Sequence, residues 1–200
     1  MADAFESPFT KALSADPAPL GLAGFAFTTF LLSFTNAGII SAGGAVVPFA
    51  IAYGGLAQLM AGIFEMRKGN TFGFTAFSSY GAFWLFYALL NLLAGMNLIT
   101  ISAHEVGMAL ILWGVFTLYM WLPAMMANFS LNLTFFFLWL AFFLLGASNL
   151  TGSMVLLHAG GYVGFLTAFF AAYTSFAIVT NYMRPGTLPL GPGLFKKKSA

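Results

Sequence analysis

Residues 133–151 read LTFFFLWLAFFLLGASNLT, a run without a single Asp, Glu, Lys, Arg or His. A helix needs about 20 mostly apolar residues to cross roughly 30 Å of hydrocarbon at about 1.5 Å per residue. Five other long apolar runs lie at 20–40, 46–66, 72–94, 106–125 and 158–180. None shows the alternation of polar and apolar residues that a membrane β-barrel requires. We therefore expect an all-α integral membrane fold with six transmembrane helices.

The composition supports a chain that is almost entirely membrane-embedded. Charged residues make up 6% of the 200 residues and hydrophobic residues 60%, whereas a soluble domain carries about a quarter charged residues. We divide the chain into an N-terminal tail at 1–19, a six-helix transport domain at 20–180 and a basic C-terminal tail at 181–200. The first apolar run is long enough to span the bilayer, so we expect it to remain as the first helix.

The distribution of basic residues predicts the orientation. With six spans, all seven Lys and Arg residues fall on one side, at Lys11, Arg67, Lys68, Arg184 and 196–198. Cytoplasmic segments are enriched in such residues. We predict a multi-pass protein of the cell (inner or plasma) membrane with both tails in the cytoplasm. The lysines at 196–198 are expected to lie against anionic lipid and not to bind nucleic acid.

The odd-numbered spans share a spaced pattern. Each carries an asparagine late in the span, and the residue eleven positions earlier, about three helical turns away on the same face, is bulky. The pairs are Phe25 with Asn36, Tyr80 with Asn91 and Leu138 with Asn149. The pattern predicts three helical hairpins around a central pathway, with the three bulky side chains at one level. Coincidence among aromatic-rich helices is the alternative.

Polar side chains on these faces are candidates for lining the pathway. Thr29 lies on the face of Phe25 and Asn36, and Gln58 interrupts a row of small residues in the second span. Lipid does not satisfy such groups, so we expect them to face the bundle interior. For each asparagine, hydrogen bonding to a neighbouring helix is as good an explanation as contact with a solute.

The absence of some residue types narrows the function. The central parts of the six spans carry no ionisable residue other than tyrosine, unlike typical proton pumps and voltage sensors. His104 and His158 have no metal-binding or triad spacing, and a phosphate-binding loop is missing. We expect neither an enzyme nor a cofactor. A hydrophobic constriction excludes hydrated ions and suits small neutral solutes or weak acids.

Several strings resemble one known family. DPAPLGL at 16–22 is similar to the Asn-Pro-Ala-Pro-Leu-Gly-Leu signature of the acetate uptake transporters, also called succinate/acetate permeases. GIFEMRKGNTFG at 62–73 and TAFSSYGAFW at 75–84 resemble the family segment that joins helices 2 and 3. YGGLAQ at 53–58 and LWGVFT at 112–117 are similar to further family strings. The resemblance spans all six helices.

The resemblance implies six helices per protomer, a homohexamer, and acetate passage through each protomer past a hydrophobic constriction. The matching constriction residues are Phe25, Tyr80 and Leu138, and Ala171 matches a position associated with substrate size. Two residues depart from the pattern: Asp16 replaces the signature Asn, and Thr35 stands where relatives often have His. An ionised Asp repels an anion, so we favour a role for Asp16 in starting the first helix.

We expect passive or proton-linked movement of acetate and similar short monocarboxylates. The sequence does not decide whether succinate is also carried. Tyr80 is expected to offer a hydroxyl while Phe25 and Leu138 close the pathway. A channel for another small neutral or weak-acid solute is the alternative. A membrane-embedded enzyme lacks a catalytic constellation, and a purely structural or sensory bundle leaves the polar stripes unexplained.

Overall fold

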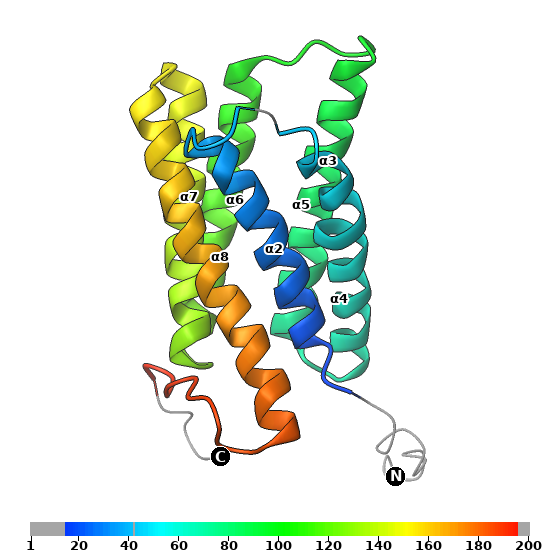
Figure 1. Ribbon diagram of the computed structural model, residues 1–200, viewed down its shortest axis with the longest axis vertical. Coiled ribbons are helices and arrows are strands. Elements are labelled where there is room, and N and C mark those ends of the chain that lie inside the picture. The colour runs from blue at the N-terminus through cyan, green and yellow to red at the C-terminus, as the bar shows by residue number, and fades with distance from the viewer. Residues whose placement is uncertain (1–14, 42, 196–200) are drawn as a thin grey trace.

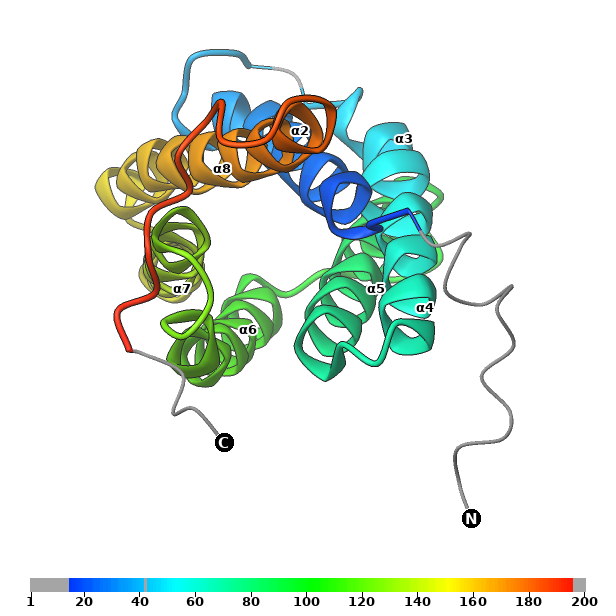
Figure 2. The ribbon, with the colours of Figure 1, turned by 90° about the horizontal axis from the view of Figure 1, so that it is seen from below.

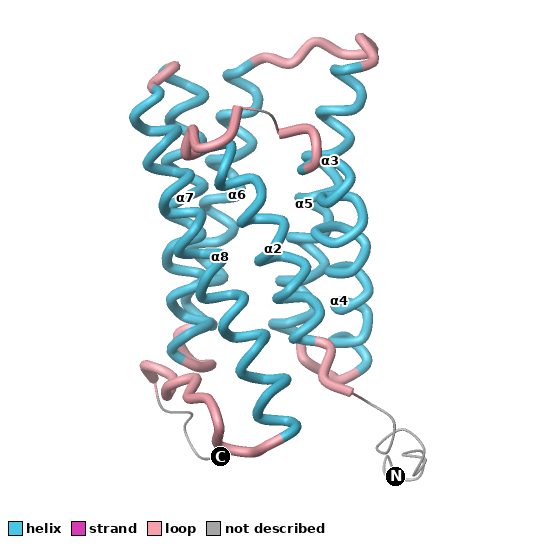
Figure 3. Tube along the Cα trace, viewed as in Figure 1, coloured by secondary structure: helices cyan, strands magenta, loops and turns pink. Residues whose placement is uncertain are grey.

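The computed structural model describes residues 15–41 and 43–195, and over this part of the chain it contains only helices and loops (Figure 3). Within these described residues, six helical segments are long and apolar enough to cross a membrane. Their bounds are α2 Ala18–Asn36, the composite second span Val46–Arg67, α5 Thr71–Gly95, α6 Ala103–Ala124, α7 Phe129–Thr151 and α8 Met154–Met183. The expected all-α fold with six spanning helices is confirmed. Lys11 and the lysines at 196–198 lie outside the described residues.

The spans form a ring in chain order (Figure 2), which α8 closes by packing against α2. The start of α2 and the end of α8 lie at the same end of the bundle (Figure 1), which we call the terminal end. The backbones of α5 and α6 stand farther apart than those of the other ring neighbours. Aromatic side chains bridge this position, with the Trp113 ring 5.2 Å from that of Phe83 and 6.2 Å from that of Tyr80.

Close approach of α8 to α2 depends on small residues. A Cβ on Gly161 would collide with the backbone of Asn36 and Ala37, and one on Gly164 would collide with the Ser33 hydroxyl. Small side chains let helix backbones approach closely in membranes, where van der Waals packing drives association. The row of small residues in the sixth span therefore acts in packing.

The second span is not one regular helix. It consists of α3 (Val46–Phe49), the π-helical segment η1 (Ala50–Ala57) and α4 (Gln58–Arg67). The wider π turn changes which face the following residues present, and such segments are often found at functional sites. Backbone contact is tight here, because a Cβ on Gly24 of α2 would lie 2.5 Å from the Tyr53 carbonyl oxygen. The apolar run at 46–66 located the span but gave no sign of this irregularity.

Several helix ends differ from the expected ones. α2 ends at Asn36, four residues early, because Gly38 takes a left-handed conformation with φ 73°. α7 starts at Phe129, where the Asn128 side chain accepts a hydrogen bond from the Leu131 amide at 2.9 Å. α8 runs from Met154 to Met183 and ends just before Pro185.

The described part of the C-terminal tail packs back onto the bundle. The Ser130 amide donates to the Leu190 carbonyl at 3.1 Å, and the Leu194 amide donates to the Met125 carbonyl at 2.8 Å. The Tyr173 hydroxyl donates to the Pro189 carbonyl at 2.6 Å. This segment therefore covers the α6–α7 connection and the first turn of α7.

Candidate functional site

Three side chains from three helices meet inside the ring. Phe25 of α2, Tyr80 of α5 and Leu138 of α7 are all at most 5% exposed, and the Phe25 and Tyr80 ring centroids are 5.7 Å apart. Phe25 and Leu138 line two different cavities, one on each side of them, whereas Tyr80 lines only one. The three residues that the eleven-residue spacing selected thus lie at the wall between two cavities.

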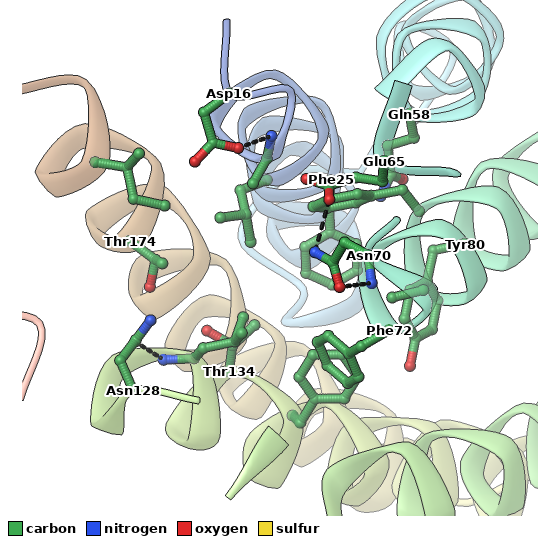
Figure 4. A pocket seen from close by; sticks show the side chains of 18 of the residues that line it. Asp16, Phe25, Gln58, Glu65, Asn70, Phe72, Tyr80, Asn128, Thr134 and Thr174 are labelled. Carbon is green, nitrogen blue, oxygen red and sulfur yellow. Dashed lines mark hydrogen bonds between the residues drawn. The ribbon is translucent and has the colours of Figure 1, made fainter. Parts of the chain in front are cut away.

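The first cavity, which we call the terminal-end cavity, has a volume of about 190 Å³. Residues of α2, α4, α5, α7 and α8 line it (Figure 4). Its polar lining comprises Asp16, Gln58, Glu65, Lys68, Asn70, Tyr80, Asn128, Thr134 and Thr174. A water molecule occupies about 30 Å³ of the liquid, so a carboxylate of acetate size fits together with some of its water.

The second cavity, the far-end cavity, has a volume of about 360 Å³. Its lining has no Asp, Glu, Lys, Arg or His among the described residues, and its polar groups are hydroxyls, amides and an indole. They include Thr29, Thr35, Asn36, Asn91, Asn149 and Thr167. A solute that crosses the chain by this route leaves the charged groups of the terminal-end cavity and enters an uncharged chamber.

Many hydroxyl and amide donors in both cavities are already used by the protein. Thr29 donates to the Phe25 carbonyl at 2.7 Å, and the Asn91 and Asn149 amides donate to the carbonyls of Tyr87 and Leu145 in their own helices. Each amide keeps a second N–H and its carbonyl oxygen for other partners. The three predicted asparagines line one cavity, but two of them also bond within their own helix.

The hydrogen of the Tyr80 hydroxyl is already used in a hydrogen bond within the protein. It donates to Thr117 Oγ1 of α6 at 3.0 Å, and Thr117 in turn donates to the Trp113 carbonyl at 2.7 Å. The expected hydroxyl contact with a solute would therefore require this bond to break. What Tyr80 presents to the terminal-end cavity in this structure is mainly its aromatic ring.

Two further predicted residues differ in their position. Gln58 is 1% exposed and lines the terminal-end cavity, with its Oε1 lacking a hydrogen-bond partner among the described residues. Ala171 is fully buried and lines neither cavity. It lies on α8 between Thr167, which lines the far-end cavity, and Thr174, which lines the terminal-end cavity. Ala171 therefore lies at about the same level along the bundle as the wall between the cavities.

Asp16 acts at the start of α2 and at the cavity mouth. Its carboxylate accepts a hydrogen bond from the Ala18 amide at 3.1 Å and pairs with Lys68 Nζ at 2.9 Å. Both side chains of the pair are 41% exposed, so the pair contributes at most about 1 kcal/mol to stability. The expected role at the helix start agrees with this geometry, and the ion pair with Lys68 is an additional contact that the sequence did not suggest.

Glu65 is the functional candidate that sequence reasoning missed. It is 0% exposed, lines the terminal-end cavity and accepts a hydrogen bond from Asn70 Nδ2 at 2.6 Å. In the sequence Glu65 stands near Arg67 and Lys68 at the end of a span, outside the central stretches from which the candidate residues were chosen. The only available signal was that Gln58 precedes it by seven residues, two helical turns on the same face.

Six spanning helices form a ring, and a hydrophobic wall inside the ring separates two cavities. This arrangement defines a helical membrane transport protein. The sequence profile of the GPR1/FUN34/yaaH family matches residues 3–190. The chain belongs to this family, which confirms the resemblance found in the sequence strings.

Named relatives and a solved structure agree with this assignment. The chain is 41% identical over 179 residues to the succinate-acetate/proton symporter SatP of Escherichia coli (strain K12), covering 88% of this chain and 95% of that protein. It is 40% identical to acetate permease A of Emericella nidulans, covering 84% of this chain and 62% of the relative. The solved structure of the bacterial acetate channel SatP superposes with a TM-score of 0.87 at 40% identity, covering 88% of this chain and 99% of that one.

Proposed function

We propose that this chain carries acetate and related short monocarboxylates across the membrane, through the terminal-end cavity, past Phe25, Tyr80 and Leu138, and into the far-end cavity. The observation that carries the proposal is that Phe25 and Leu138 line both cavities. A movement of these two side chains would open the wall that separates the chambers. The named substrates of the relatives, succinate and acetate, support the carboxylate class.

The polar groups would partly replace water around the carboxylate. Desolvation of an ionised carboxylate is expensive unless hydrogen-bond donors compensate. Lys68, which is paired with Asp16, would offer its remaining ammonium N–H donors at the mouth of the terminal-end cavity, and the free amide N–H groups of Asn36, Asn91 and Asn149 would supply donors beyond the wall. The apolar wall between them would select the solute by size.

The direct test is uptake of labelled acetate into lipid vesicles that contain only the purified protein. We expect uptake above that of empty vesicles at matched lipid and pH, saturation with acetate, and competition by propionate. No uptake above the empty vesicles would refute the proposal. Equal transport of an uncharged solute of the same size would favour a channel for small neutral solutes instead.

We also propose a homohexamer in the cell membrane with both termini in the cytoplasm. Arg67, Lys68 and Arg184 support this orientation, because the first two stand at the end of α4 and the third at the end of α8, and both helix ends lie at the terminal end (Figure 1). Large apolar side chains such as Leu112 and Val155 cover the outer surface and suit contact with lipid or with other protomers. Native mass spectrometry from mild detergent tests the subunit number.

The chain has no cysteine, which makes the orientation easy to test. Single cysteines at Thr187, near the terminal end, and at Ser102, at the other end, can be reacted with a membrane-impermeant maleimide in intact cells. We expect labelling of the Ser102→Cys protein only. Labelling of the Thr187→Cys protein alone would reverse the proposed orientation.

A further inference from the structure

Two buried polar side chains of α4 face the terminal-end cavity without complete hydrogen bonding. Gln58 is 1% exposed and Glu65 is 0% exposed, and both line this cavity. Gln58 Oε1 and Glu65 Oε1 have no hydrogen-bond partner among the described residues. Buried polar atoms are nearly always paired, and exceptions call for an explanation such as a catalytic role or an unseen ligand. Two exceptions on one cavity wall point to a group that binds there.

The surroundings of Glu65 hold the carboxyl in place. Asn70 Nδ2 donates to Glu65 Oε2 at 2.6 Å, and Asn70 Oδ1 accepts from the Gly73 amide at 3.2 Å (Figure 4). A Cβ on Gly73 would lie only 2.8 Å from Glu65 Cδ, so a larger residue there would displace the carboxyl. One oxygen is thus fixed by Asn70, the N-cap residue of α5, and the other has no partner among the described residues.

The charges that act on Glu65 are few. Lys68 and Asp16 are near enough to influence it, and they form an ion pair with each other at the cavity mouth. α2 carries no ionisable residue, and the ionisable residues of α5 are its two tyrosines, Tyr80 and Tyr87. Glu65 therefore has no ionic partner within 4 Å among the described residues. A charged solute that enters the cavity would therefore meet a carboxyl group, that of Glu65, without an ionic partner.

The hydroxyl groups that line this cavity already donate their hydrogens within the protein, so they are not free to donate to a substrate carboxylate. Tyr80 donates to Thr117, Thr134 donates to the Ser130 carbonyl at 3.0 Å, and Thr174 donates to the Phe170 carbonyl at 2.7 Å. A carboxyl group in its acid form adds one O–H donor. Glu65 in this form supplies the missing hydroxyl donor inside the cavity.

We propose that Glu65 is the proton-exchange group of this transporter, which protonates the substrate carboxylate in the terminal-end cavity before it passes Phe25 and Leu138. The proton on Glu65 moves to a substrate oxygen, which leaves the Glu65 carboxylate and a neutral acid. A proton from the bulk solution, carried as hydronium to the cavity mouth, then reprotonates Glu65 and leaves water. Neutralising the substrate removes most of the cost of entering the apolar wall and the uncharged far-end cavity. This inference rests on the proposed carboxylate transport.

The competing explanation is purely structural. Glu65 could serve only to orient Asn70, which in turn caps α5 through the Gly73 amide. Glu65→Gln separates these roles, because glutamine has the same shape and retains an oxygen that accepts from Asn70 but carries no proton that titrates. Glu105→Gln is the matched control: Glu105 is an exposed carboxyl in the first turn of α6 and lines neither cavity.

The experiment compares two modes of acetate movement in vesicles containing purified protein. Exchange of labelled for unlabelled acetate at equal pH needs no net proton movement, whereas net uptake driven by a pH gradient does. For Glu65→Gln we expect a loss of at least tenfold in both modes, after subtraction of empty vesicles, because every passage of the wall takes a proton from Glu65 even where the net proton movement is zero. Glu105→Gln should retain both modes.

Two results would overturn the assignment: full exchange or full gradient-driven uptake by folded Glu65→Gln, as a purely structural role predicts, or an equal loss of both modes in Glu105→Gln. If Glu65→Gln does not fold, a hydrophobic carbodiimide applied to the unaltered protein decides the matter. We expect modification at Glu65 that acetate reduces, and no modification there would refute the proposal. Absence of exchange by the unaltered protein would instead refute carboxylate transport itself.

Discussion

Replacing Leu138 with alanine tests the proposed wall between the cavities most directly. Leu138 is 5% exposed and lines both the terminal-end and the far-end cavity. The substitution removes three carbon atoms from a side chain that contacts both chambers. One methylene in a hydrophobic pocket changes discrimination about 10- to 200-fold. We therefore expect propionate flux to rise relative to acetate flux by about tenfold or more, and butyrate flux to rise further.

The assay measures uptake of labelled acetate, propionate and butyrate into the same vesicles, each corrected for empty vesicles and for the amount of folded protein. The correction matters because Leu→Ala in a packed interior costs about 2–5 kcal/mol of stability. Leu140→Ala is the control, since Leu140 lies on the same helix and lines neither cavity. An unchanged propionate-to-acetate ratio in Leu138→Ala, or an equal change in Leu140→Ala, would show that Leu138 does not limit substrate size.

Two further predictions concern packing and the tyrosine ring. In Gly24→Ala the new Cβ would lie 2.5 Å from the Tyr53 carbonyl oxygen, so we expect a stability loss of about 1–3 kcal/mol and a lower melting temperature, whereas Gly95→Ala, with open space around it, should melt like the unaltered protein. Equal melting of both variants would contradict the close α2–η1 contact. Tyr80→Phe removes the bond to Thr117, worth about 0.5–1.5 kcal/mol, but keeps the ring. We expect acetate flux within about threefold of normal, and a tenfold loss would mean that the hydroxyl contacts the substrate directly.

The sequence was sufficient to locate the spans because hydrophobic length is a local property. The run at 133–151 carries its own evidence for a spanning helix, since crossing the bilayer depends on the number of apolar residues alone. Helix ends were less accurate. The end of α2 depends on the left-handed Gly38, and the start of α7 on a cap by Asn128, and each is a local geometry that hydrophobicity does not report.

The spacing of residues along single helices also brought part of the candidate site together. Phe25, Tyr80 and Leu138 were selected from three helices by a common distance to an asparagine, and they line one cavity in the structure. The sequence argument also expected the Tyr80 hydroxyl to contact the solute, but in the structure this hydroxyl already has a hydrogen-bond partner. Its hydrogen goes to Thr117, thirty-seven residues away on a different helix, and no spacing within α5 could reveal that partner.

What the sequence by itself determined is therefore the membrane class, the number of spans and the faces that bear bulky and weakly polar groups. These follow from hydrophobic length and from the helical repeat, both of which act over a few turns of one helix. Tertiary structure alone decided how the six spans close into a ring and that two cavities meet at Phe25 and Leu138. It also decided that Glu65, which looks in the sequence like a boundary residue, is fully buried. Burial of that carboxyl results from the packing of α4 against α2 and α5, segments whose contacts no single stretch of chain encodes.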